Sequence, residues 1–98
     1  MSVLETIRFH LREGVSDEDF LGRNQTVERE YMAKRPGFSA RWTSKSATGE
    51  WLVVVRWNSV AEAEATINEF LKAPQTQEFL AVVDPSTVSS GHYELVED

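Results

Sequence analysis

The two histidines of the chain, His10 and His92, are the first residues to consider for catalysis. Imidazole is the only side chain whose ordinary pKa makes it a natural proton shuttle near neutral pH. His92 shares strand parity with Glu94 and could share a face with Glu5, so we predict that it is a general base for an acidic phenol or enol. The alternative is a histidine on a solvated edge strand. His10 has the opposite parity to Ile7 and is expected to face away from a pocket.

Two hydrogen-bond donors, Asn24 and Tyr31, recur with Phe20 and Val27 at helical spacing. A buried amide without partners loses about 1 to 3 kcal/mol, so Asn24 indicates either a pocket or a buried hydrogen bond. The Tyr31 hydroxyl could donate into the far end of the same pocket or reach solvent. We predict that both donors hold a developing oxyanion.

An aromatic wall is predicted from the segment 50–59, EWLVVVRWNS, because alternate residues of a strand share one face. Its substrate-pocket residues would be Trp51, Val55 and Trp57, joined by Ile7 and Phe9 from the first strand. Trp57 would stack on a flat ligand. The structural alternative is that these tryptophans only fill the core, and Trp42 is expected to pair with Trp51 across a hairpin.

The elements that must position these residues form a strand–helix–strand pattern that occurs twice. Strands are predicted at 3–11, 38–43, 51–57 and 88–96 from period-two alternation. Helices are predicted from Ser16 to before Arg35 and from Ser59 to before Pro74, each with an acidic residue three positions after the serine. Residues 75–83 are expected to form a separate short helical piece.

This order predicts an α+β fold in a single domain over residues 1–98: a ferredoxin-like split βαβ repeat with a four-stranded antiparallel sheet and both helices on one face. Strand 51–57 is apolar on both faces, which indicates that the second face is also covered. Exposure of Leu4, Leu52, Val54 and Tyr93 would leave a large apolar patch. We therefore predict a homodimer in which sheet packs against sheet.

The composition excludes several classes of site. The 98 residues contain no cysteine, which rules out disulfides, iron–sulfur clusters and thiolate chemistry. The net charge of -6, with scattered lysines and arginines, disfavours nucleic acid as a partner. No apolar stretch approaches the roughly 20 residues that span a bilayer, and residues 1–11 do not look like a signal peptide, so we expect no membrane partner and a cytoplasmic location.

Four motifs together carry a family resemblance. They are a first strand running to Gly14, the segment 35–38 (RPGF), the segment 49–51 (GEW) and the segment 56–59 (RWNS) before an alanine-rich helix. With these motifs the chain resembles the dimeric α+β barrel superfamily and, within it, the antibiotic biosynthesis monooxygenase-like (ABM) group. The resemblance implies a dimeric α+β barrel with a ligand between sheet and helices, and Trp57 matches the tryptophan that lines this pocket in the family.

The resemblance also bears on cofactors. The haem-degrading branch of the superfamily uses a strand-one asparagine, the strand-three tryptophan and a histidine ligand on the following helix. Here Ile7 stands in place of the asparagine, and residues 59–83 contain no histidine. Haem is therefore disfavoured for want of an axial ligand, and we expect no cofactor.

The function implied by the resemblance is a cofactor-independent monooxygenase that acts on a small planar or polyketide-like substrate. The protein would deprotonate a phenol or enol, and the substrate carbanion would itself reduce dioxygen. The alternative is a non-catalytic homodimer that binds a small hydrophobic metabolite or has a filled core, and an isomerase is a third possibility. A cavity of roughly 300 Å³ or more, and a histidine that reaches it, would favour an enzyme.

Overall fold

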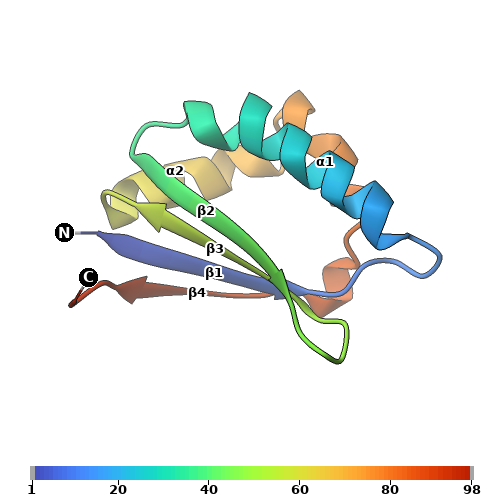
Figure 1. The fold of residues 1–98 in the computed structure, drawn as a ribbon. Coiled ribbons are helices and arrows are strands. Elements are labelled where there is room, and N and C mark those ends of the chain that lie inside the picture. Colours follow the sequence, from blue (N-terminus) through green and yellow to red (C-terminus); the bar gives the residue numbers. More distant parts are fainter. Residues whose placement is uncertain (1, 98) are drawn as a thin grey trace.

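The computed structural model describes residues 2–97 and has the predicted order of elements (Figure 1). The four strands form one antiparallel sheet in the order β2-β3-β1-β4, and the helices lie on one face of it (Figure 1). The elements are β1 (Val3–Phe9), α1 (Asp17–Glu30), η1 (Met32–Lys34), β2 (Phe38–Lys45), β3 (Trp51–Trp57), α2 (Val60–Phe70), η2 (Pro74–Thr76), α3 (Gln77–Leu80), η3 (Pro85–Thr87) and β4 (Ser89–Glu94). The predicted α+β fold is confirmed.

Both long helices begin where the serine caps were expected. The Ser16 hydroxyl accepts a hydrogen bond from the backbone N–H of Asp19 at 3.1 Å, and Ser59 accepts one from Glu62 at 3.3 Å. Each bond satisfies a backbone donor that has no partner within its helix. The chain turns before Pro74, and the short α3 follows as the predicted separate helical piece. These local signals determine where the two helices begin and where the second one ends.

The predicted cross-strand pair of Trp42 and Trp51 is wrong, because β2 carries an irregularity between Phe38 and Ala40. One extra residue in a strand reverses which of the following side chains face each side of the sheet. Trp42 therefore lies on the face away from the helices, where it is 53% exposed. The residue opposite Trp51 is Lys45, whose Nζ lies 5.4 Å from the centroid of the indole ring.

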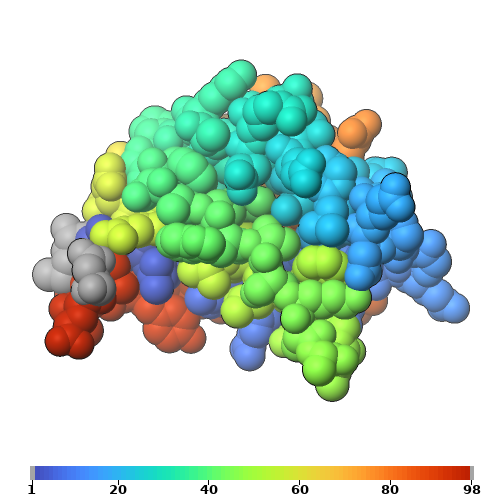
Figure 2. Space-filling view, in the orientation of Figure 1, coloured from blue at the N-terminus to red at the C-terminus, as the bar shows by residue number. Residues whose placement is uncertain are grey.

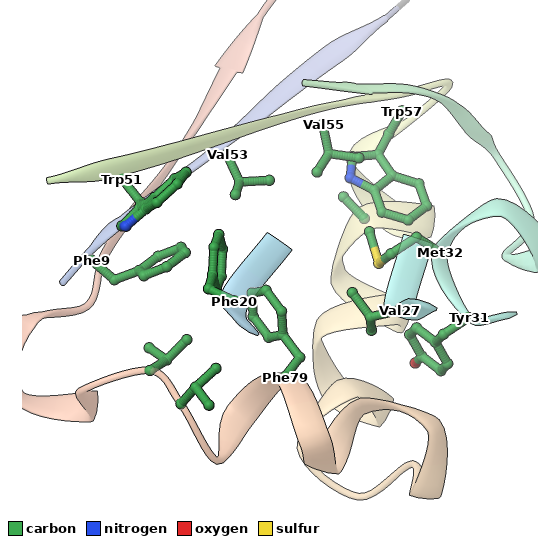
Figure 3. Packing of buried hydrophobic residues seen from close by; sticks show 13 residues of the cluster. Phe9, Phe20, Val27, Tyr31, Met32, Trp51, Val53, Val55, Trp57 and Phe79 are labelled. Atoms are coloured by element: carbon green, nitrogen blue, oxygen red, sulfur yellow. The ribbon is translucent and has the colours of Figure 1, made fainter. Parts of the chain in front are cut away.

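The hydrophobic core fills the space between the sheet and the helices. Trp51 and Trp57 stand at the two ends of β3 and point to the helical side, as Figure 3 shows. Phe20 from α1 packs against Trp51 with ring centroids 4.6 Å apart, and it meets Phe9 edge to face at 5.6 Å. Trp57 is completely buried. The aromatic wall predicted for β3 is thus part of a packed core.

The opposite face of the sheet carries no helix among the described residues, as Figure 1 shows. Side chains of the strands project from this side of the molecule in the space-filling view (Figure 2). By strand register, the apolar residues of this open face include Leu4, Leu52, Val54, Trp42 and Tyr93. Within residues 2–97, no helix has the length and apolar character required to cross a membrane.

Candidate functional site

A cavity of about 390 Å³ lies between the sheet and the helical layer. Its sheet side includes Ile7, Phe9 and Val55, three of the five residues predicted to form the pocket wall. All of its lining residues are apolar except for four, which are Glu5, Arg41, Thr66 and Ser90. An apolar cavity with a few polar groups is the usual form of a small-molecule site, and this one has room for a small ring system.

The mouth of the cavity lies where its lining residues reach the surface. Leu71, which directly follows α2, is 71% exposed, Ile67 of α2 is 38% exposed, and Val88, just before β4, is 47% exposed. These three side chains give the mouth an apolar rim between α2 and the segment that leads into β4. A hydrophobic ligand that enters here would contact apolar side chains at the rim as well as inside the cavity.

The cavity contains a buried carboxyl group, that of Glu5. Glu5 alternates with Thr6 along β1 and so faces the helices, where it is only 4% exposed. The indole Nε1–H of Trp57 donates a hydrogen bond to its Oε1 at 3.0 Å. Burial raises the pKa of Glu5 above its ordinary value, while the bond from Trp57 and the charges of His92 and Arg41 act in the opposite direction. Glu5 is therefore a more basic carboxylate than an exposed glutamate.

A buried guanidinium, that of Arg41, also lines the cavity. Its side chain is 3% exposed, and it donates hydrogen bonds to Asn24 Oδ1 at 2.7 Å and to Glu28 Oε1 at 3.4 Å. Burial lowers the pKa of Arg41, and attraction to Glu28 and Glu5 partly offsets this. Arginine remains protonated under such conditions, so the cavity holds a fixed positive charge as well as a carboxyl group.

His92, the predicted base, lies beside Glu5 and outside the cavity lining. The two residues are register partners on the adjacent strands β1 and β4. His92 Nε2 is 4.0 Å from Glu5 Oε2, and the histidine side chain is 34% exposed. The expected face shared by His92 and Glu5 is present, with the glutamate inside and the histidine at the solvent side.

The two predicted donors make their hydrogen bonds within the protein, and neither lines the cavity. The Asn24 amide donates to Thr43 Oγ1 at 3.0 Å while its oxygen holds Arg41. The Tyr31 hydroxyl donates to the backbone oxygen of Thr66 at 3.3 Å, and burial raises its pKa. Asn24 fits the alternative of a buried hydrogen bond. Direct catalytic roles for these residues stay predictions.

Trp57 and Trp51, the remaining predicted wall residues, also lie outside the cavity lining. Trp57 is linked to the cavity through its hydrogen bond to Glu5. Through this contact Trp57 positions the carboxylate, and the stacking role predicted for it stays a prediction. Among residues 2–97, no three histidine or acidic side chains gather in a way that could hold a metal ion.

Of the two charged residues that line the cavity, Glu5 was considered from the sequence only as a partner of His92, and Arg41 was assigned no role. The signal for Glu5 was present, because it shares strand parity with the apolar Val3 and Ile7. A charged residue on the buried parity of a strand needs a partner or a function. Arg41 gave no such signal, because the irregularity in β2 moves it to the helical side against the alternation of the sequence.

Comparison with known proteins supports the fold. No protein-family profile matches the chain, and no curated protein matches it by sequence. SnoaB, a cofactor-independent oxygenase from Streptomyces nogalater, superposes with a TM-score of 0.79 at 13% identity, covering 99% of this chain and 95% of that one. A candidate antibiotic biosynthesis monooxygenase from Bordetella bronchiseptica superposes with a TM-score of 0.76 at 16% identity, covering 98% of both chains.

A dimeric protein of ferredoxin-like fold from Bacteroides fragilis also matches, with a TM-score of 0.63, 12% identity and 96% coverage of both chains. Identities this low show a shared fold and leave activity open. The chain therefore shares its fold with these proteins, as the resemblance to ABM-like proteins implied.

Proposed function

We propose that this protein is a cofactor-independent monooxygenase that acts on a small planar or polyketide-like substrate held in the cavity between sheet and helices. The observation that carries this proposal is an apolar cavity of about 390 Å³ that contains one buried carboxyl group and one buried guanidinium. The shared fold with SnoaB, a cofactor-independent oxygenase, is in accord with it.

The chemistry requires a base, a stabilised anion and the exclusion of water. A base removes a proton from a phenol, an enol or the CH2 group next to it, and the resulting carbanion reduces dioxygen directly. Overall the CH2 group becomes a carbonyl, one atom of dioxygen is retained and the other leaves as water with both hydrogens. No external reductant is needed. Arg41 would stabilise the negative charge on the substrate oxygen, and the apolar walls would keep that charge from water.

Two features were expected to favour an enzyme: a cavity large enough for a ring system and a histidine that reaches it. The first is present. The cavity exceeds the roughly 300 Å³ needed for a ring system, which argues against a filled core. The titratable group that reaches it is Glu5 rather than a histidine, with His92 next to it. Burying a carboxyl group and a guanidinium is costly, and such pairs cluster at functional sites, which favours an enzyme over a simple binder.

A non-catalytic binder of a small hydrophobic metabolite remains the second candidate, because the apolar mouth fits it equally. Titration with flat phenolic and polyketide-like compounds, followed by tryptophan fluorescence, separates the outcomes. We expect saturable quenching and, for the best ligands, uptake of one dioxygen per ligand with formation of a carbonyl product. Binding without oxygen uptake would favour the binder or the isomerase. If no compound binds, the enzyme and the binder are both refuted.

We also propose that the open face of the sheet forms a homodimer. The face is apolar around Leu52 and Val54, and the Bacteroides fragilis relative of the same fold is described as dimeric. Val54→Glu should give a mass near that of one 11.1 kDa chain by light scattering, where the unaltered protein gives about twice that mass. Val60→Glu, on the exposed surface of α2, is the matched control and should stay dimeric.

A further inference from the structure

One pair of side chains on the helical face of the sheet links the cavity to solvent at the β1–β4 edge. Glu5 lines the cavity, and among the described lining residues it is the only carboxylic acid. Its register partner His92 is on the edge strand β4, 34% exposed, with 4.0 Å between Nε2 and Glu5 Oε2. A path therefore leads from the cavity through a carboxylate and an imidazole to solvent.

We infer that Glu5 is the proton acceptor of the cavity and that His92 passes this proton to solvent. The inference rests on the proposed function, since it assigns roles within the same site. The structure gives the two groups different positions: Glu5 is enclosed where a substrate would lie, and His92 is placed where exchange with water is possible.

The groups that face Glu5 come from the other three strands of the sheet. Trp57 from β3 holds Oε1 and so fixes the carboxylate, Arg41 from β2 supplies positive charge, and His92 from β4 approaches Oε2. Desolvation raises the pKa of Glu5, which brings its basicity closer to that of an efficient general base. The Trp57 bond and the charge of Arg41 lower the pKa of Glu5 again and keep the carboxylate form accessible.

The proposed step balances without a further reactant. A C–H or O–H bond of the substrate breaks, its proton forms an O–H bond on the Glu5 carboxylate, and the electron pair stays on the substrate as an enolate or phenolate beside Arg41. The Glu5 proton then passes to Nε2 of His92, which releases a proton to water. At 4.0 Å this transfer requires one bridging water or a small side-chain rotation.

The experiment measures proton abstraction apart from oxygen chemistry. The probe is 2-tetralone, a flat bicyclic ketone with an acidic CH2 group, in deuterated buffer without oxygen. NMR follows replacement of its hydrogens by deuterium in the presence of wild-type protein, Glu5→Gln, His92→Gln and the control Glu94→Gln. Glu94 is an exposed acid on the same strand as His92 and has no place in the proposed path.

We expect Glu5→Gln to slow protein-dependent exchange by about 10²- to 10⁴-fold, the usual contribution of a general base. The glutamine oxygen can still accept the Trp57 hydrogen bond, so 2-tetralone binding, read by fluorescence quenching, and thermal unfolding should show an intact site. His92→Gln should slow exchange with unchanged binding, and free imidazole in the buffer should restore it. Glu94→Gln should match the wild type.

Several outcomes overturn the inference. It fails if 2-tetralone binds the wild type without exchange, if Glu5→Gln keeps wild-type exchange, or if imidazole gives no rescue of a slowed His92→Gln. Exchange without dioxygen uptake in air would support the roles of Glu5 and His92 and refute the proposed monooxygenase activity. Dioxygen uptake that persists in Glu5→Gln would support the monooxygenase activity and refute the role of Glu5. If 2-tetralone and the other flat compounds all fail to bind, both proposals fall.

Discussion

Replacement of Trp57 by phenylalanine tests whether its indole holds a charged carboxylate in the core. Trp57 is completely buried, and its Nε1–H donates to Glu5 Oε1 at 3.0 Å. The substitution removes two buried ring carbons, worth about 1.5 kcal/mol in lost burial. It also removes a hydrogen bond to a charged group, worth about 1.5 to 3 kcal/mol. We expect the free energy of unfolding at neutral pH to fall by about 3 to 4.5 kcal/mol.

The matched control for this prediction is Trp51→Phe at the other end of β3. Trp51 is 5% exposed and loses the same ring atoms, but within residues 2–97 the structure gives its indole no hydrogen bond. Its cost should be near 1.5 kcal/mol from lost burial alone. Urea unfolding followed by circular dichroism, at one protein concentration for all variants, measures both changes.

The cost in unfolding free energy should differ between Trp57→Phe and Trp51→Phe, and the pH dependence of this difference tests whether Glu5 is the partner of Trp57. The Trp57 bond favours the charged form of Glu5, so its loss raises the pKa of that carboxyl group further. The excess cost should be about 1.5 to 3 kcal/mol while Glu5 is ionised and shrink to about 1 kcal/mol once acid has protonated it. Equal costs for the two variants, or a difference that does not change with pH, would refute this reasoning.

Three further substitutions test the site. Burial raises the pKa of Glu5 above 4.5, so just above that pH the folded protein binds more protons than the unfolded chain. The stability of the wild type should therefore fall as pH rises through this window. Thermal unfolding between about pH 4 and 8 should show this fall for the wild type and not for Glu5→Gln. Val88→Trp at the mouth should weaken ligand binding at least about 10-fold by calorimetry, whereas Val96→Trp, which is not a lining residue and is 84% exposed, should not. Asn24→Ala removes an acceptor from Arg41 and should cost about 1.5 to 3 kcal/mol in urea unfolding, against less than about 0.5 for the exposed neighbour Gln25→Ala.

Local signals in the sequence were sufficient for the fold. The serine caps at Ser16 and Ser59, the break at Pro74 and the period-two strands predict each main element close to its observed bounds. These features act within a few residues, so they can be read along the chain. The irregularity after Phe38 could not, because it depends on pairing between β2 and β3, and it is the reason that Trp42 was placed on the wrong face.

The candidate site was harder to predict because its chemistry depends on contacts distant in sequence. Histidine drew attention to position 92 through its ordinary pKa, whereas the pKa of Glu5 is unusual only because of where the fold places it. The bond between Glu5 and Trp57 joins residues 52 positions apart, and Arg41 reaches the cavity only through the altered register of β2. The apolar wall from Ile7, Phe9 and Val55 needed only strand parity.

The core arrangement around Glu5 also favours the proposed enzyme over the proposed binder. A pocket that only bound a hydrophobic metabolite would gain nothing from a carboxylate, because removing that charge from water is unfavourable and must be offset by Trp57, Arg41 and His92. A neutral residue at position 5 would bind the same ligand without this cost. A buried acid beside a buried cation is useful where a proton leaves a ligand and negative charge remains behind. The energetic cost of burying Glu5 therefore supports the proposal that the cavity abstracts a proton from its ligand.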